Sequence, residues 1–220
     1  MKKTILSLAV VSFVFFTSCK NEKTSEETVV DETVETMVEE PVATAFDYTI
    51  ETGNSVIDWK GTKPTGEHMG TVALKSGGFM VADNVVTGGE FVIDMNSITV
   101  TDLQGDEKAG LEGHLKGTGE EEKADHFFNV NKFPTGEFKI KSVVDGKVTG
   151  DLTLKGVTNE VSFPAKIEVN ENGVSLVSEA FKIDRTKWGV NYSSKSVFDD
   201  LKDKFINDEI ELTVKVKAVK

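Results

Sequence analysis

The sequence predicts an all-β domain, an antiparallel barrel or sandwich of about eight strands with one or two short helices. Apolar and polar residues alternate in successive runs along the chain, which is the period of half-buried strands. Glycine, asparagine and aspartate clusters separate many of these runs and are typical of turns. Strands that follow one another in this way pair antiparallel and close into a barrel or stack as a sandwich.

The alternation places large apolar side chains on one face of each predicted strand. In residues 91–95, for example, Phe91, Ile93 and Met95 share a face. Eleven phenylalanines lie after residue 45, enough either to line an internal cavity or to fill a solid core. The predicted strands are 55–60, 91–95, 137–141, 148–154, 161–169, 177–183 and 210–218.

Turns are predicted where small and polar residues separate the runs. Asp145-Gly146 lies between two alternating runs and is a strong hairpin signal. The other predicted turns are Gly77-Gly78, Gly88-Gly89 and Asn170–Gly173.

Two stretches break the strand pattern and are predicted to contain helix. Residues 106–128 have few β-forming residues and are expected to hold one or two short helices. Residues 196–205 place Val197, Leu201 and Phe205 at a spacing of four, which favours a short amphipathic helix.

Residues 1–18 are predicted to be a signal peptide. Two lysines precede an apolar run over residues 5–16, which is shorter than the roughly 20 residues that span a bilayer. Cys19, the only cysteine, follows two small residues in a stretch that resembles a bacterial lipobox. We therefore expect Cys19 to be the lipid attachment site; the alternative is an ordinary signal peptide with an incidental cysteine.

Residues 19–45 are predicted to be the lipidated cysteine and a flexible acidic tether. This segment carries eight acids, two lysines and no aromatic residue, so it lacks the apolar surface to fold alone. Of the chain's net charge of −12, residues 1–18 contribute +2 and the tether −6, which leaves −8 for the barrel domain, residues 46–220. An acidic domain is a poor candidate for binding nucleic acid.

The expected location is outside the cytoplasm, anchored to a membrane by the lipid on Cys19. Lys20 follows the cysteine, and it is not the aspartate associated with retention at the inner membrane. The outer membrane, facing the periplasm, is therefore favoured, while display at the cell surface stays open. The sequence leaves a monomer and a homodimer equally open.

From Tyr48 to Val219 the sequence resembles the YceI-like family. The motifs that carry the resemblance occur in the family's order: the opening Tyr48–Ile50 and 55–61, the H-x-G-x-V step at 68–72, the long strand 89–98, the 114–116 and 125–134 segments, Gly150–Thr158 and Phe181–Val190. The resemblance implies a lipocalin-like barrel. One departure is the loop 117–123, which is longer and more acidic and is a candidate gate to the barrel.

The resemblance also implies an apolar tunnel that shelters one long lipid, with no catalytic residues, no metal and no other cofactor. The expected ligand is a polyisoprenoid, such as a quinone tail, or a fatty acyl chain. The side chains expected to line the tunnel are those on the inward faces of the predicted strands: Trp59, Phe91, Ile93, Met95, Phe138, Leu152, Leu154, Phe163, Phe181 and Trp188.

His68, Arg185 and Tyr192 are the candidates for the polar end of the tunnel. Arg185 is the only arginine, and its guanidinium suits a phosphate head group. A structural ion pair with its neighbour Asp184, holding a strand end, is the favoured interpretation of Arg185.

Two other functions stay open at this point. One is a metal-assisted hydrolase that uses His68, His114 and His126, although their spacing matches no metal motif. The other is a structural or stress-related lipoprotein whose barrel is solid, which an internal void of less than about 300 Å³ would favour.

Overall fold

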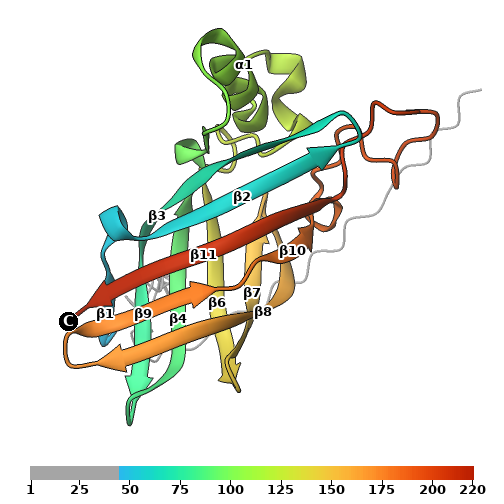
Figure 1. Ribbon diagram of the computed structural model, residues 1–220. Coiled ribbons are helices and arrows are strands. Elements are labelled where there is room, and N and C mark those ends of the chain that lie inside the picture. Colours follow the sequence, from blue (N-terminus) through green and yellow to red (C-terminus); the bar gives the residue numbers. More distant parts are fainter. Residues whose placement is uncertain (1–44) are drawn as a thin grey trace, which may run out of the picture. The chain divides into compact units, whose positions relative to one another are not determined.

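The structure is a computed structural model that describes residues 45–220. The predicted signal peptide 1–18, Cys19 and all but the last residue of the predicted tether lie outside the described residues. Figure 1 shows long antiparallel strands with α1 at one end of them. The strands are β1 Tyr48–Ile50, β2 Val56–Lys63, β3 Gly66–Ala82, β4 Val85–Asp94, β5 Thr99–Val100, β6 Thr135–Val144, β7 Lys147–Leu154, β8 Val157–Asn170, β9 Gly173–Ser178, β10 Phe181–Asp184 and β11 Glu209–Val219.

Eight of these strands close into a ring. Neighbouring strands pair in the order β2-β3-β4-β6-β7-β8-β9. The last strand, β11, pairs with β2 along one edge and with β9 along the other. All of these pairs are antiparallel. The prediction of an antiparallel lipocalin-like barrel is therefore confirmed.

The run 177–183, predicted as one strand, is two. β9 and β10 lie one after the other along the same edge of β11. Between them the Ser178 hydroxyl accepts a hydrogen bond from the Val214 N–H, and the Glu179 N–H donates to the Pro164 carbonyl. These bonds satisfy the backbone where the chain leaves β11. The alternation of apolar and polar residues in the sequence continues through this point, so it does not reveal the break.

Two predicted turns are wrong, because both glycine pairs lie inside strands. Gly78 and Gly89 belong to the facing strands β3 and β4. A Cβ on Gly78 would come within 2.6 Å of the Phe46 ring, so glycine is there for close packing. The chain turns instead at Asp83 and Asn84, which have φ values of 50° and 60°.

The other two turns are confirmed. Asp145 and Gly146 have φ values of 50° and 72°, the left-handed pair that a two-residue hairpin needs, and they join β6 to β7. Residues 170–173 likewise join β8 to β9.

Helix is confirmed in residues 106–128 and absent from residues 196–205. The first region holds α1 Gly105–Lys116 and the 3-10 helix η3 Glu121–His126. Gly117 ends α1 in the left-handed conformation, as is usual for a helix C-terminus. In 196–205, Asp200 and Lys202 have φ values of 60° and 51°, which a right-handed helix cannot contain. The helix predicted from the four-residue spacing of apolar side chains is therefore wrong.

Packed side chains close the barrel at the end opposite α1. Phe79 and Val148 are fully buried there, and Phe79 meets the edge of the Phe91 ring at 5.0 Å. Tyr48 and Ala218, from the short β1 and the end of β11, are also buried. Within residues 45–220, no helix has the length and apolar character that a membrane span requires.

Candidate functional site: an apolar cavity in the barrel

A cavity of about 380 Å³ lies inside the barrel, within the range of small-molecule pockets. Side chains from the inward faces of the ring strands line it, together with others from α1 and the segment after η3. Most of them are apolar. This volume is larger than about 300 Å³, the value below which a solid barrel would be favoured.

The residues predicted to line the tunnel surround this cavity, with one exception. They come from β2, β4, β6, β7, β8 and β10 and from the turn that follows β4. The lining residues among them are Trp59, Phe91, Ile93, Met95, Phe138, Leu152, Leu154, Phe163 and Phe181.

Trp188 is the exception and corrects the prediction. It lies in the 3-10 helix η4 Arg185–Trp188, is almost fully buried, and is not among the residues that line the cavity. Its indole N–H donates to the Leu152 carbonyl at 2.9 Å. Trp188 therefore ties η4 to β7, and alternation could not reveal this because η4 is not a strand.

Aromatic rings form one side of the wall. Phe163 stacks on Phe181 at 4.4 Å between ring centres, and Phe138 lies 5.7 Å from Phe163. These residues come from β6, β8 and β10, so the barrel brings together rings that are far apart in the sequence. Polar residues lie on the outer face of the same part of the sheet. On β7 and β8, for example, the Thr149 and Ser162 hydroxyls share a hydrogen bond.

The polar residues of the lining gather at the α1 end. His68, Arg185 and Tyr192, the three predicted from the sequence, all border the cavity there. His114, which the sequence analysis considered as a metal ligand, also borders the cavity here, and sequence reasoning missed the other polar residues at this end, which are Thr62, Lys63 and Asn207. Nothing local in the sequence marks them, because each reaches the cavity from the end of a strand or a loop.

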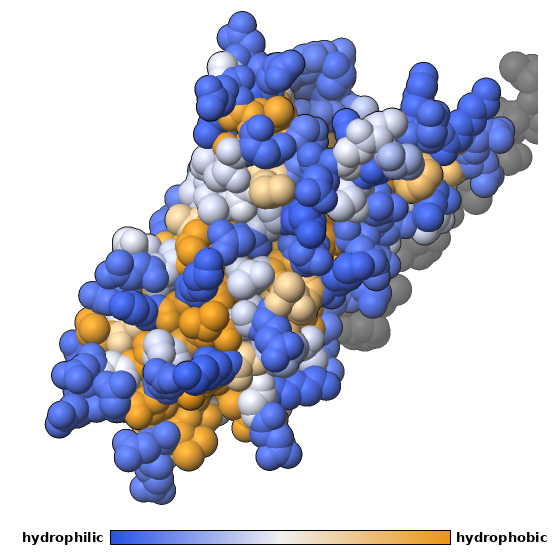
Figure 2. All heavy atoms as spheres, viewed as in Figure 1, coloured by the Kyte–Doolittle hydropathy of each residue, from blue (hydrophilic) through white to orange (hydrophobic). Residues whose placement is uncertain are grey.

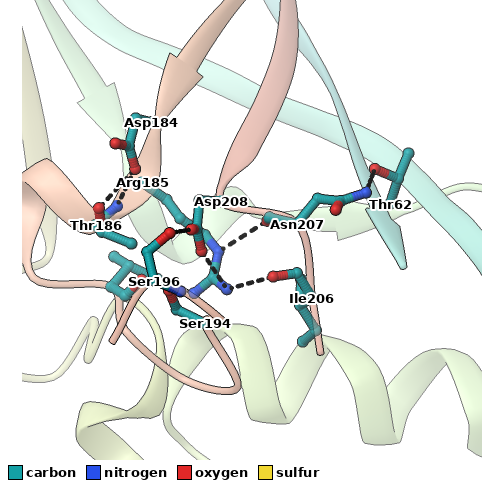
Figure 3. Close-up of polar contacts among 10 residues, drawn as sticks. Thr62, Asp184, Arg185, Thr186, Ser194, Ser196, Ile206, Asn207 and Asp208 are labelled. Carbon is teal, nitrogen blue, oxygen red and sulfur yellow. Dashed lines mark hydrogen bonds and ion pairs between the residues drawn. The ribbon is translucent and has the colours of Figure 1, made fainter. Parts of the chain in front are cut away.

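Arg185 is buried, with 2% of its surface exposed. Its guanidinium donates to the carbonyls of Val190 at 2.6 Å, Ile206 at 3.1 Å and Asn207 at 3.2 Å. Figure 3 shows the contacts of the guanidinium with Ile206 and Asn207 near the end of the 191–208 loop, and the bond to Val190 holds the residue before its start. Such charge-assisted hydrogen bonds are strong. Arg185 therefore holds the loop closed at its base.

The ion-pair partner of Arg185 is Asp208 and not Asp184, which corrects the prediction. Asp208 lies 3.6 Å from the guanidinium, whereas Asp184 caps η4 by accepting from the Thr186 N–H at 3.0 Å. Burial lowers the pKa of Arg185, and the two aspartates oppose that shift. The structural role favoured for Arg185 fits this geometry, because the guanidinium is occupied.

The pKa of Asp208 is likewise set by burial on one side and by neighbouring groups on the other. Burial raises the pKa of this carboxyl, but hydrogen bonds from Ser194 and Ser196 and the charge of Arg185 together bring it below its ordinary value. Asp208 is therefore ionised at neutral pH, and the pair at the base of the loop carries no net charge.

Two of the three histidines meet at the α1 end. His114 Nε2 and His126 Nδ1 are 2.9 Å apart and share a hydrogen bond. Tyr192 stacks on His126 at 4.3 Å and meets the edge of His114 at 4.8 Å. Burial lowers the pKa of His114, with smaller contributions from the charges of His126 and Lys123. This cluster ties α1 and η3 to the 191–208 loop.

His68 lies apart from that pair. Its Nδ1 is 2.8 Å from the Asp102 carboxylate, whose other oxygen accepts from the Met69 N–H. Within residues 45–220, no three His, Cys, Asp or Glu side chains are grouped as metal ligands. The structure thus joins two of the histidines proposed for a metal site and gives the third a carboxylate partner.

Apolar side chains from α1 and from the segment after η3 cover the α1 end of the cavity. Leu111 and Leu115 project from α1, and Phe127 and Phe128 follow η3. None of the residues of α1 or η3 is fully buried. We refer to residues 105–128 as the lid, because they cover the cavity while the residues of α1 and η3 stay at least partly exposed.

The match to known proteins covers the same residues. The model of the YceI-like domain family matches residues 48–218. The UPF0312 protein SAB2563 of Staphylococcus aureus is 37% identical over 81 residues, which are 32% of this chain and 45% of that protein. The chain thus spans about half the length of the curated relatives it matches.

Two solved structures share the fold. A polyisoprenoid binding domain from Saccharophagus degradans, implicated in plant cell wall breakdown, has a TM-score of 0.58 and 14% identity, covering 80% of this chain and 99% of its own. BcnA of Burkholderia cenocepacia has the same TM-score and 16% identity, covering 77% and 99%. With the family model matching most of the barrel and the fold agreeing with it, this chain belongs to the YceI-like family.

Proposed function

We propose that this protein binds one long-chain apolar lipid, a polyisoprenoid or a fatty acyl chain, inside its barrel and is not an enzyme. The observation that carries the proposal is the cavity of about 380 Å³ with its apolar wall. The name of the Saccharophagus degradans domain, which is a polyisoprenoid binding domain, supports the same class of ligand.

Burial of the chain would supply the affinity. Each CH₂ group removed from water is worth about 0.8 kcal/mol, so a chain of about 20 carbons is worth ~15 kcal/mol before the cost of ordering it. A ligand of this kind needs no charged contact. This agrees with an arginine whose donors are already occupied by the carbonyls of Val190, Ile206 and Asn207.

We further propose that the protein is an exported lipoprotein anchored through Cys19 to the outer membrane. The apolar run before Cys19 and the acidic segment after it support this. The anchor would hold the barrel close to the bilayer from which long-chain lipids come. Its role is carriage or sequestration of the lipid.

Binding is tested by titrating the full chain with a long-chain prenyl quinone while following tryptophan fluorescence, because Trp59 lines the cavity. The blocking variant V161F/V214F enlarges two lining residues. The control V144F enlarges an exposed residue on the β6–β7 turn.

The expected result is saturable quenching in the wild type and in V144F, and none in V161F/V214F. Circular dichroism establishes that each variant is folded. No quenching in the wild type, or equal quenching in the folded blocking variant, contradicts the proposal.

A further inference from the structure

The loop 191–208 joins η4 to β11 and borders the cavity. Tyr192 near its start and Ile206 and Asn207 near its end belong to the lining. Arg185 fixes both ends, as described above. The fully buried Ser194 accepts hydrogen bonds from the Val197 and Phe198 N–H groups, which orders the first half of the loop. The loop therefore has a firm base beside the cavity.

The tip of this loop displays apolar side chains to solvent. Val197 is 47% and Phe198 50% exposed. Figure 2 shows an apolar patch among hydrophilic residues on the loop that projects at the right. Because a buried arginine holds the base, the tip presents these two neighbouring apolar side chains at the end of an ordered loop, where they are available to a partner.

The place of the loop indicates what this partner is. The opposite end of the barrel is filled by buried side chains such as Phe79 and Val148, so a ligand would enter at the α1 end, where polar residues join the lining and the lid covers the cavity. A long apolar lipid that enters there comes from a bilayer. An exposed phenylalanine beside the entrance is suited to the boundary between lipid head groups and acyl chains.

The charges of the tip agree with a membrane that carries no net charge. Residues 195–205 contain Lys195, Lys202 and Lys204 and three aspartates, so the tip is neutral within an acidic domain. Lys195 lies over the Phe205 ring at 4.7 Å. A lysine at the tip can keep its ammonium at the head groups while Val197 and Phe198 enter the bilayer.

We propose that the 195–205 tip is a bilayer-docking element, which inserts Val197 and Phe198 into a zwitterionic phospholipid surface while the lipid passes between the bilayer and the cavity. The proposal rests on the lipid-binding function proposed above. Association is driven by apolar burial and is therefore insensitive to salt.

The insertion is tested with the full chain and phosphatidylcholine vesicles whose acyl chains carry bromine, which quenches nearby tryptophan. F198W reports on the tip. The matched control V144W reports on an exposed valine, 61% accessible, at the opposite end of the barrel. Relative to wild type, the added fluorescence of F198W shifts to the blue and is quenched, and that of V144W is not. Equal quenching of both, or quenching of V144W alone, overturns the proposal, and an unquenched F198W shows that the tip meets water or another protein.

Transfer of lipid separates this proposal from the function on which it rests. V197S/F198S is expected to take up a prenyl quinone from vesicles about tenfold more slowly than wild type and from detergent micelles at an unchanged rate, while V144S matches wild type with both donors. Unchanged uptake from vesicles, or an equal loss with both donors, overturns the docking role. A wild type that takes up lipid from neither donor overturns the proposed function itself.

Discussion

Replacing Arg185 with methionine removes the side chain that holds the base of the 191–208 loop. Methionine fills a similar space and has no N–H donors. Arg185→Met would leave the carbonyls of Val190, Ile206 and Asn207 without their hydrogen-bond donor. It would also leave Asp208 without its counter-ion.

The expected loss of stability is large for a single substitution. Three hydrogen bonds from a charged donor, at about 1.5 kcal/mol each, give a loss of about 4.5 kcal/mol. This agrees with the cost of about 3–5 kcal/mol for breaking a buried ion pair by removing one partner. A surface role for the arginine, with the guanidinium available to a ligand, would cost less than about 1 kcal/mol.

Urea unfolding at neutral pH, followed by circular dichroism, measures the free energy of unfolding. The matched control is Lys182→Met, because Lys182 forms an exposed pair with Glu209 that is worth less than about 1 kcal/mol. R185M/D208N should lose less than the sum of the two single variants, since Asp208 depends on Arg185. A loss of under about 1 kcal/mol in R185M would refute the structural role.

Three further predictions each concern a single residue. Gly70→Ala would drive a Cβ into the Thr99 carbonyl oxygen and place it 2.7 Å from the Trp59 ring, and should lower the free energy of unfolding by at least about 3 kcal/mol. Gly61→Ala, which has open space, should cost less than about 1 kcal/mol, and equal losses contradict the packing argument. Burial lowers the pKa of His114 in the folded chain, so the unfolded chain takes up the proton first and stability falls as the pH drops below about 6.5. His114→Phe should flatten that fall in urea unfolding between mildly acidic and neutral pH, and an unchanged slope would assign it to other groups. Cys19→Ala should move the protein from the membrane to the soluble fraction of cells with its lipid still bound, and a variant that stays in the membrane fraction contradicts the anchor.

The ring of strands could be predicted because each strand has one solvent-facing side and one side that faces the interior of the barrel. In β7, for example, Leu152 and Leu154 line the cavity while Thr153 between them shares a hydrogen bond with Thr158. Apolar and polar residues that alternate with a period of two in the sequence reflect this arrangement directly. The same period runs through the break between β9 and β10, where the Ser178 hydroxyl replaces a strand contact, so it could not reveal that break.

The α1 end could be predicted only in part. His68 and Tyr192 stood out by residue type, but the partner of Arg185 is Asp208, 23 positions along the chain, on the far side of a loop. Such a pair depends on how the loop closes, and nothing local encodes it. The helix predicted in 196–205 failed for the same reason: Val197 is spaced like a helix face and yet is exposed on a loop.

Native mass spectrometry of the full chain, purified without added lipid and then incubated with a prenyl quinone, tests the central claim most directly. We predict a complex whose added mass corresponds to one long-chain lipid, present in the wild type and lost in V161F/V214F, which narrows the cavity. A wild-type chain that carries no lipid and takes up none, or a blocked variant that carries as much as the wild type, would contradict lipid binding inside the barrel.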